Sequence, residues 1–297
     1  MNKILLIGIT GQVGQELRQS LTTIGDVTGV GRQQLDLTQI ERVRDRITEI
    51  KPDLIVNAAA YTAVDKSESE SDLAMAINAT APKELAIAAR DIGAKMLHIS
   101  TDYVFDGCHH TPYLETDPTN PLGIYGKSKL LGEIGVRENG DRHLVLRTAW
   151  VYGSRGHGNF VKTMLRLGAE REELKVVADQ IGSPTWSHDI AEAITQLLDK
   201  SLTDESVAGV YHFTNSGIAS WYDLAVATFE EAKQLGFSLK IKRVIPISTA
   251  EFPTPTQRPA YSVLSKAKIG ETLGYYPPHW RESLRKMLTE WQSLKNL

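Results

Sequence analysis

The chain has 297 residues, of which 41% are hydrophobic and 23% are charged, and its formal net charge is −3. These values are ordinary for a globular protein, and without a long basic run nothing indicates nucleic acid or an anionic membrane surface as a partner. No stretch approaches 18 consecutive apolar residues and Cys108 is the only cysteine, so we expect a cytoplasmic protein without a transmembrane helix or an intrachain disulfide.

The first predicted strand, residues 4–7, leads into a glycine-rich turn and then into a helix over residues 15–24. Gly8, Gly11 and Gly14 have the spacing Gly-x-x-Gly-x-x-Gly. A strand, a glycine turn and a helix in this order are typical of a dinucleotide site, in which the backbone approaches the pyrophosphate and the helix N-terminus faces its charge. A tight turn without a ligand is the alternative interpretation. We favour a cofactor site at these three glycines.

The second predicted strand, residues 27–30, ends just before Arg32. In NAD sites an acidic residue usually stands here and binds the ribose hydroxyls, whereas an arginine accommodates the 2′-phosphate of NADP. No acid stands at this strand end, although Asp36 follows shortly after. Arg32 therefore favours NADPH as the cofactor, with NADH also possible. A solvated surface arginine is the alternative.

The alternation of strands and helices continues and becomes less regular after Gly153. We expect further strands at residues 54–56, 95–99, 143–146 and 210–213, an extended segment at 174–177, and helices at 39–50, 72–92, 159–167, 188–198, 222–235 and 281–294. Residues 100–124 and 244–262 contain several prolines, so we expect irregular structure there.

This order predicts an α/β fold, a doubly wound parallel sheet (Rossmann fold) with a smaller C-terminal α/β substrate lobe. We assign residues 1–157 with about 186–215 to the Rossmann domain. The substrate lobe then comprises about 158–185 with 216–297.

Tyr125 and Lys129 are four residues apart and would lie on one face of a helix, one turn apart. A lysine cation beside a tyrosine favours the phenolate, which makes the tyrosine a usable acid–base group. A surface pair on a helix is the alternative. Ligands of such sheets bind outside the carboxyl ends of the strands, so we expect the glycine turn, Ala58–Ala60, Thr101 and Tyr125 to share one crevice. Thr101 and Tyr125 would hydrogen-bond a substrate carbonyl while a nicotinamide delivers hydride to its carbon.

Several longer motifs occur in one order along nearly the whole chain. They are GITGQVG at residues 8–14, NAAAYTAVD at 57–65, STDYVF at 100–105, YGKSK at 125–129, RTAWVY at 147–152, GSPT at 182–185, and RP at 258–259 with Ser262. This set resembles the extended short-chain dehydrogenase/reductase family and, more narrowly, its dTDP-4-dehydrorhamnose reductases.

The resemblance implies a role for each matching residue. Tyr125 would donate the proton, Lys129 would lower the pKa of Tyr125 and hold the nicotinamide ribose, and Thr101 would complete the triad. The implied cofactor contacts are Gly11, Gln12, Val13, Asp36, Leu37, Ala60, Tyr61 and Thr62, and the implied substrate contacts are Thr101, Asp102, Tyr125 and Trp150. The implied reaction is the reduction by NADPH of the C4 ketone of a dTDP-sugar, dTDP-4-dehydro-β-L-rhamnose, to dTDP-β-L-rhamnose.

The same fold hosts three other functions that bear on this sequence. Nucleotide-sugar dehydratases carry an acidic residue after a Thr-Asp pair, and Tyr103 stands at that position here. C4 epimerases retain NAD, and Arg32 counts against them without excluding them. A non-enzymatic regulatory subunit, similar to the β subunit of methionine adenosyltransferase, stays open because it would retain the cofactor pocket.

We expect no metal site. Cys108, His109 and His110 are adjacent in a loop and rarely converge on one ion in this way. Some reductases of the family that the chain resembles form dimers around Mg²⁺ held by glutamates, and two of those positions match Glu16 and Glu290. The third is His188, an imidazole that Mg²⁺ accepts poorly. We therefore interpret both glutamates as solvated helix charges and expect a monomer or a homodimer without a bridging metal. We also expect Trp221, Trp280 and Trp291 to lie in the core or an interface rather than to stack on a ligand.

Overall fold

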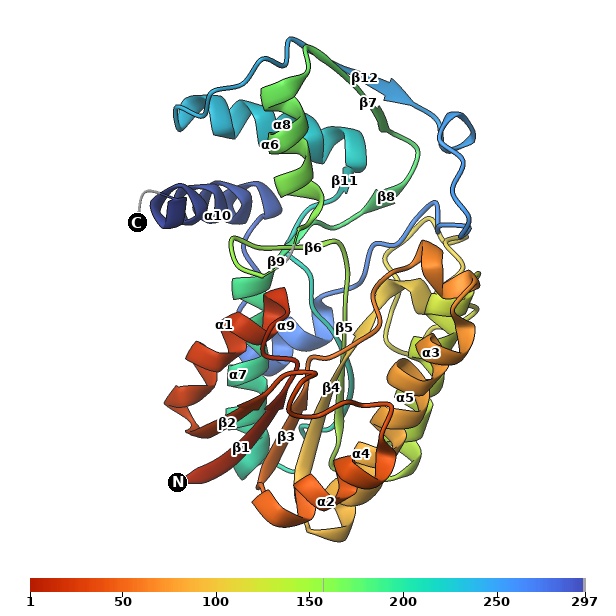
Figure 1. Ribbon diagram of the computed structural model, residues 1–297, viewed down its shortest axis with the longest axis vertical. Helices are drawn as coiled ribbons and strands as arrows, with labels where there is room; N and C mark the ends of the chain where they lie inside the picture. Colours follow the sequence, from red (N-terminus) through yellow and green to blue (C-terminus); the bar gives the residue numbers. More distant parts are fainter. Residues whose placement is uncertain (157, 296–297) are drawn as a thin grey trace.

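Six parallel strands form the centre of the larger part of the molecule, in the order β10-β5-β4-β3-β1-β2 (Figure 1). The structure is a computed structural model and describes residues 1–156 and 158–295. The strands are β1 (Asn2–Ile7), β2 (Gly25–Val30), β3 (Leu54–Asn57), β4 (Lys95–Thr101), β5 (Leu144–Thr148) and β10 (Gly209–His212). Each of the six coincides with a segment that the sequence predicted as a strand, and the doubly wound fold is confirmed.

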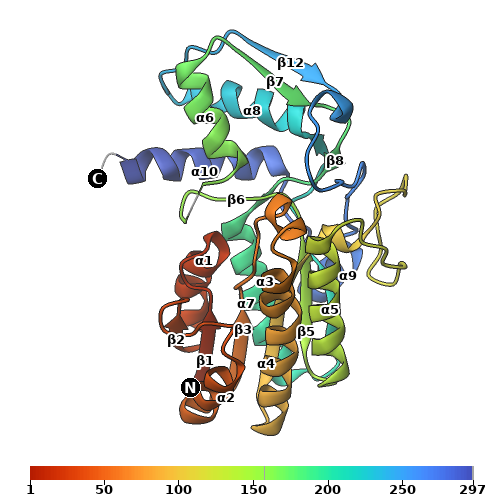
Figure 2. The ribbon, with the colours of Figure 1, turned by 45° about the vertical axis from the view of Figure 1, so that its right-hand side comes forward.

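Both faces of this sheet are covered by helices (Figure 2). In β1, Ile4 and Leu6 pack into one core cluster, while Leu5 and Ile7 pack into the other. The first cluster includes residues of α1 (Gln12–Ser20), α7 (Ser187–Thr203) and α9 (Ala267–Leu273), and the second includes residues of α2 (Ile40–Ile50), α4 (Ala81–Asp91) and α5 (Ile124–Glu138). Burial on both faces explains why the inner strands β1, β3, β4 and β5 are largely apolar rather than alternating.

The winding direction changes at β1. The chain passes from β1 to β2 on one side and then crosses to β3 on the other side. Ligands of doubly wound sheets bind where the strand order reverses, outside the carboxyl ends of the strands. The turns after β1 and β3, which begin at Gly8 and Ala58, lie at that point.

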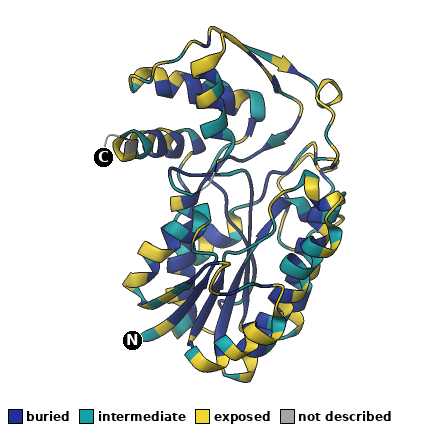
Figure 3. Ribbon diagram, in the orientation of Figure 1, coloured by how far each residue is buried: buried dark blue, intermediate teal, exposed yellow. Residues whose placement is uncertain are grey.

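A smaller group of elements packs above the carboxyl ends of the sheet (Figure 1). Its helices are α6 (Phe160–Glu170), α8 (Trp221–Gln234) and α10 (Trp280–Lys295), and its strand pairs are β7 (Glu173–Val177) with β12 (Arg243–Ile247) and β8 (Ile181–Gly182) with β11 (Ala219–Ser220). A third short pair, β6 (Val151–Tyr152) with β9 (Thr185–Trp186), lies where the chain passes between the two parts. The buried residues of α8 and α10 face each other across an apolar core that includes Trp280 and Leu284 (Figure 3).

Two elements differ from the sequence prediction. Residues 244–262 were expected to be irregular, but β12 occupies the first of them and contains Pro246. A proline is tolerated there because β12 is an edge strand of a two-stranded sheet. The short helix α9 was not predicted, and it packs against α7 and β10. Helix α9, which falls within the predicted lobe segment 216–297, therefore lies on the Rossmann domain and not on the smaller lobe.

The predicted helix over residues 72–92 is a run of three helical segments. They are α3 (Ser71–Met75), a π-helical segment η3 (Ala76–Thr80) and α4, which has Pro82 in its first turn. None of the helices within residues 1–156 and 158–295 combines the length and the apolar character that crossing a bilayer requires.

Candidate active site

The glycine turn after β1 brings the backbone of two loops together. Gly8 has a φ of +91°, and a Cβ there would lie 2.7 Å from the backbone nitrogen of Ala59. A Cβ on Gly14 would clash with the Gly8 carbonyl. Gly11 is the N-cap of α1 and supplies no side-chain cap, so Gln12 and Val13 begin the helix with backbone N–H groups that suit an anion. These residues fit the pyrophosphate of a dinucleotide.

Arg32 follows β2 at the same edge of the sheet. Its side chain is 75% exposed, and its Nε lies 3.9 Å from Oδ2 of Asp36. The Asp36 carboxylate accepts hydrogen bonds from the backbone and the hydroxyl of Thr38, at 3.0 and 2.8 Å, and these hold its pKa below the usual range. Leu37 is buried between the sheet and α2. Arg32 is thus an exposed cation of this turn.

Thr101, Tyr125 and Lys129 come from two elements and are all buried. Thr101 ends β4, while Tyr125 and Lys129 lie in successive turns of α5. Burial raises the pKa of Tyr125 to about 12, and a hydrogen bond with the Thr101 hydroxyl acts in the opposite direction. The structure therefore brings together the phenol and the hydroxyl that the sequence assigned to one carbonyl oxygen.

The Lys129 side chain points beneath the end of β4. Its Nζ donates to the carbonyl oxygen of Ile99 at 2.6 Å and lies 3.2 Å from Nε2 of His98. Burial lowers the pKa of Lys129 to about 8, and the Glu133 carboxylate opposes that shift. The lowering of the Tyr125 pKa by Lys129, which the resemblance implied, stays a prediction.

The first turn of α5 is capped by a residue far away in the sequence. Its N-cap, Gly123, has no side chain, and Oε1 of Glu68 accepts the backbone N–H of Ile124 at 2.9 Å. Glu68 ends a short 3₁₀ helix, η2 (Asp65–Glu68). The sequence gave no signal of this contact, because the two residues are 56 positions apart.

The same 3₁₀ helix contacts the segment that leads back from the smaller lobe. Asp65 and Arg258 form an ion pair at 2.9 Å, and the Thr256 hydroxyl donates to the Val64 carbonyl at 3.0 Å. The helix η2 therefore touches both the start of α5 and the lobe segment.

The loop after β3 is held against α5 by Asn78, a buried residue of the π-helical segment. Its Oδ1 accepts the backbone N–H of Tyr61 at 2.8 Å, and its Nδ2 donates to the Tyr61 carbonyl at 3.0 Å and to the Ser128 hydroxyl at 3.1 Å. This fixes the predicted cofactor contacts Ala60, Tyr61 and Thr62 beside the helix of Tyr125. The sequence prediction had assigned no role to Asn78.

Asp102 follows Thr101 and is almost fully buried. Burial raises its pKa to about 6, with the Ser262 and Thr101 hydroxyls acting in the opposite direction. The Thr101 hydroxyl donates to Oδ1 of Asp102 at 3.0 Å. Asp102 thus lies close to Thr101, at the end of β4, and to Ser262, which comes from the segment after the smaller lobe.

Trp150 is one of the two non-glycine residues with positive φ in the described part of the chain, at +49°. Its ring stacks on Trp221, with the ring centroids 3.6 Å apart and an interplanar angle of 1°. Trp221 is half-buried, and its Nε1 donates to Gln180 at 3.1 Å. The predicted substrate contact Trp150 is therefore held in an unusual backbone conformation by a second indole from α8.

The interpretation of Glu16 and Glu290 as solvated charges is wrong. Glu16 is only 3% exposed, and it lies 3.8 Å from the Arg155 guanidinium and 3.6 Å from Nδ1 of His188, whose pKa it raises. Arg155 also pairs with Glu290 at 3.4 Å, and the Ser154 hydroxyl donates to Glu290 at 2.7 Å. The turn after β6 covers Glu16, and no helical pattern in the sequence predicts that. In residues 1–156 and 158–295, no three His, Cys, Asp or Glu side chains are arranged to hold a metal ion.

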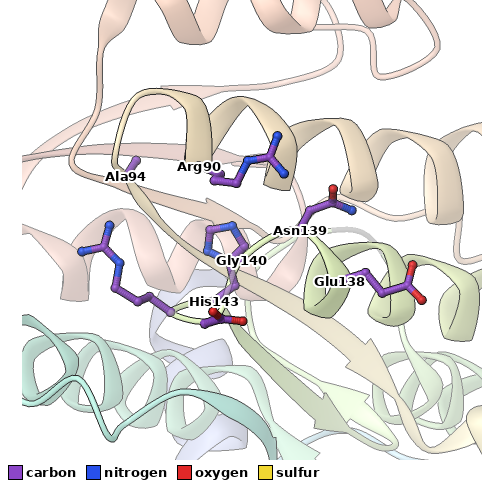
Figure 4. A pocket seen from close by; sticks show the side chains of 8 residues that line it. Arg90, Ala94, Glu138, Asn139, Gly140 and His143 are labelled. Carbon is purple, nitrogen blue, oxygen red and sulfur yellow. The ribbon is translucent and has the colours of Figure 1, made fainter.

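A surface cavity of about 430 Å³ lies elsewhere, between the C-terminal ends of α4 and α5 (Figure 4). His143 and Ala94 line it, at the amino ends of β5 and β4, so it opens at the edge of the sheet opposite Thr101. It is therefore not part of the candidate active site.

Comparison with known proteins agrees with this geometry. The model of the family described as RmlD substrate binding domain matches residues 1–293. The chain is 45% identical over 285 residues to a dTDP-4-dehydrorhamnose reductase of Burkholderia thailandensis, covering 94% of this chain and 95% of that one. It is 43% identical over 291 residues to the enzyme of the same name from Escherichia coli, covering 97% of each.

Solved structures give the same picture. The dTDP-4-dehydrorhamnose reductase of Bacillus anthracis, solved in complex with NADP, is 40% identical with a TM-score of 0.90, covering 97% of this chain and 99% of that one. A UDP-glucose 4-epimerase of Thermus thermophilus has a TM-score of 0.81 at 22% identity, covering 98% and 99%, and shows the shared fold alone.

Proposed function

The chain belongs to the RmlD substrate binding domain family, and we propose that it reduces the C4 ketone of dTDP-4-dehydro-β-L-rhamnose to dTDP-β-L-rhamnose with NADPH. It is an oxidoreductase, as are its closely similar relatives. The observation that carries the proposal is the convergence of Thr101, Tyr125 and Lys129 at the carboxyl end of β4, on the same edge of the sheet as the glycine turn after β1.

The cofactor would lie with its pyrophosphate at Gly8, Gly11, Gln12, Val13 and Gly14, and with its adenine end at Arg32, Asp36 and Leu37. Ala60, Tyr61 and Thr62 would contact the ribose side. When bound, NADPH supplies the hydride that is added to C4 of the sugar. Arg32 is the exposed cation of this edge and would meet the 2′-phosphate.

Tyr125 would supply the proton. As C4 of the sugar gains hydride, its oxygen gains negative charge, and the Tyr125 hydroxyl transfers its proton to that oxygen. The Thr101 hydroxyl, which donates to Asp102 in this structure, would turn to donate a hydrogen bond to the same oxygen, and the Tyr125 phenolate would then regain a proton from solvent. Both groups are buried, so an oxyanion placed between them would be shielded from water and strongly stabilised. Lys129, one turn below, would favour the phenolate when it carries a charge.

The sugar nucleotide would lie between the sheet and the smaller lobe. Asp102 comes from the strand end of Thr101, and Trp150 from the turn after β5, with its ring held by Trp221. We propose the division into a Rossmann domain and a sugar-nucleotide lobe with α9 reassigned to the former. We further propose a cytoplasmic enzyme that is a monomer or a dimer without a bridging metal.

The test is turnover by the purified protein. With NADPH and dTDP-4-dehydrorhamnose, absorbance at the reduced nicotinamide band should fall, and the product should be identified as the rhamno rather than the talo epimer by NMR. Tyr125→Phe should lose this activity, whereas Tyr211→Phe, in a buried tyrosine of β10 outside the site, should keep it. Cofactor binding without turnover would instead support a regulatory subunit, and a talo product would refute the proposed stereochemistry.

A further inference from the structure

The buried imidazole of His98 lies between Asn57 and Lys129. His98 pairs with Asn57 across the β3–β4 ladder, and both side chains are fully buried. Nδ2 of Asn57 lies 3.1 Å from Nδ1 of His98. Oδ1 of the same amide accepts the backbone N–H of Ala59, also at 3.1 Å. Asn57 opens the motif NAAAYTAVD, whereas His98 lies in the strand before STDYVF, and the sequence gives no signal of this contact.

These contacts determine which imidazole nitrogen carries the proton. Because Oδ1 of Asn57 is occupied by the Ala59 N–H, the amide nitrogen is the group that faces His98, and it can only donate. Nδ1 of His98 is therefore the acceptor. Burial lowers the pKa of His98 well below its ordinary value, so the ring is neutral and its single proton sits on Nε2.

The Nε2–H group faces Nζ of Lys129 at a distance of 3.2 Å. An ammonium has three donors and no acceptor, so it cannot accept this hydrogen. A neutral amine can accept it with its lone pair while it donates to the Ile99 carbonyl at 2.6 Å. The hydrogen bonds around Lys129 are therefore complete only when the amine is neutral.

The charged neighbours of Lys129 do not reverse this preference. The carboxylate of Glu133, one turn further along α5, favours the ammonium. That carboxylate is already engaged by the Arg147 guanidinium of β5 and by the Ser100 hydroxyl of β4. His212 of β10, beyond Arg147, is buried and its pKa is lowered, so it adds no charge. Tyr125, one turn before Lys129, keeps its proton because burial raises its pKa.

We propose that His98 is a positioning residue which Asn57 holds in the Nε2–H tautomer, so that it donates to Lys129 and favours the neutral amine. Its consequence for catalysis rests on the proposed function. If the charged form of Lys129 supports the Tyr125 phenolate, activity is present while Lys129 is protonated and is lost as the pH rises through its pKa. His98 then sets the pH of that loss.

The first test reads the tautomer in the unmodified protein and needs no activity. In a ¹⁵N-labelled sample, long-range ¹H–¹⁵N spectra distinguish a protonated from an unprotonated imidazole nitrogen. We expect His98 to carry its proton on Nε2 at every pH between about 6 and 9. A proton on Nδ1 would overturn the proposal, because Lys129 could then donate to Nε2 as an ammonium.

The second test measures whether the titration midpoint of Lys129 rises or falls when His98 is replaced. In protein with ¹³C-labelled lysine, Lys129→Met identifies the Lys129 signal, and its titration is followed in wild type and in His98→Leu. Removing an Nε2–H donor should raise the titration midpoint of Lys129 by about one pH unit, because only the neutral amine loses a hydrogen bond. A midpoint that falls or does not change would contradict the proposal. If Lys129 instead donated to His98 as an ammonium, the variant would lose a hydrogen bond that stabilises the charged form, and the midpoint would fall.

His143→Leu is the matched control. His143 is also a buried imidazole of this sheet, and its Nδ1 accepts the Met96 N–H at 3.3 Å, far from Lys129 and at the cavity of Figure 4. The midpoint of Lys129 should not move in this variant, and an equal shift would show that the effect of His98→Leu is not specific. If His98→Leu does not fold, the tautomer of His98 in the wild-type protein still supports or overturns the proposal.

The kinetic readout links the inference to the reaction. In wild type, kcat/KM should fall on the alkaline side with a midpoint at about pH 8. In His98→Leu this midpoint should rise by the same amount as the titration midpoint of Lys129. An unmoved midpoint of kcat/KM would refute the role of His98 in the reaction. A protein that does not reduce the sugar at all would refute the proposed function, while the two spectroscopic tests would still decide the arrangement of protons.

Discussion

Arg147 of β5 and Glu133 of α5 form a fully internal ion pair one helical turn beyond Lys129. The guanidinium donates to the carboxylate from Nε at 2.9 and 3.1 Å and from Nη2 at 2.7 Å. Neither side chain is more than 2% exposed. Since the Ser100 hydroxyl binds the same carboxylate, this pair ties the strand of Thr101 to the helix of Tyr125.

Removing one partner of this pair should destabilise the fold severely. Glu133→Gln leaves the Arg147 charge buried without its counter-ion, and such changes cost roughly 3–5 kcal/mol. Urea unfolding of the purified variant measures the loss. Glu170→Gln, which breaks an exposed pair with Arg166, should change stability by under about 1 kcal/mol. Similar losses in both variants would show that burial of the Glu133 pair has no special effect.

Tyr125→Phe should leave NADPH binding near the wild-type level but reduce turnover. The phenyl ring still packs in the same place, whereas the donated proton is gone, and general acid–base groups typically contribute about 10²–10⁴-fold. Fluorescence titration of NADPH and single-turnover rates separate the two effects. The proposed role is wrong if the variant keeps more than about a tenth of the rate when chemistry limits turnover.

Arg32→Ala should reduce the preference for NADPH over NADH. A lost charge-assisted contact with phosphate corresponds to about ten- to a hundred-fold in kcat/KM. The measurement is kcat/KM with both cofactors, and Arg171→Ala, an exposed arginine of the smaller lobe, is the control. If wild type uses NADH as well as NADPH, Arg32 is a surface charge only.

Asp102→Asn should stabilise the protein at neutral pH and much less in acid. The folded-state pKa of Asp102 is raised from 3.8 to about 6, so the folded state holds a proton that the unfolded state has released, and stability falls as the pH rises across this window. Asparagine does not titrate, so the variant lacks this contribution to the dependence of stability on pH. Unfolding at about pH 4.5 and 7.5 should show a difference of about 2 kcal/mol in the effect of the variant. The exposed Asp26→Asn should show none.

Magnesium should not control the oligomeric state. The Arg155 guanidinium already lies against both Glu16 and Glu290, and His188 contributes a second cation when it is protonated. We expect light scattering after size exclusion to give one mass in EDTA and in excess Mg²⁺. A dimer that dissociates in EDTA and returns with magnesium would refute this and would show that Arg155 moves away to admit the ion.

Local patterns in the sequence were sufficient for most of the fold. The inner strands of the sheet contain apolar runs, and Gly8 and Gly14 mark a turn in which a Cβ would not fit. The strand β12 was missed because its Pro246 argues against a strand unless the strand is known to be an edge, which only the tertiary structure shows. The helix α9 was missed because seven residues give too weak a periodicity to detect.

The sequence was sufficient to name the groups that we propose for the reaction, but not the side chains that surround and support them. Thr101, Tyr125 and Lys129 stand in recognisable motifs, and the structure places them together. Glu68 and His98 act across long sequence separations, and such contacts leave no local pattern. The assignment of Glu16 was wrong for the same reason, because the turn that covers it comes from residues about 140 positions later.

The helix η2 has a consequence for engineering of substrate specificity. Asp65 of η2 binds Arg258, its N-cap Val64 binds Thr256, and Glu68 of η2 binds the start of the Tyr125 helix. In a chimera that takes its sugar-nucleotide lobe from another family member, the contacts between this lobe and residues 64–68 would be mismatched. They would be kept only if residues 64–68 are transplanted with the lobe. In a recombination library, residues 64–68 and the sugar-nucleotide lobe should therefore always come from the same parent protein.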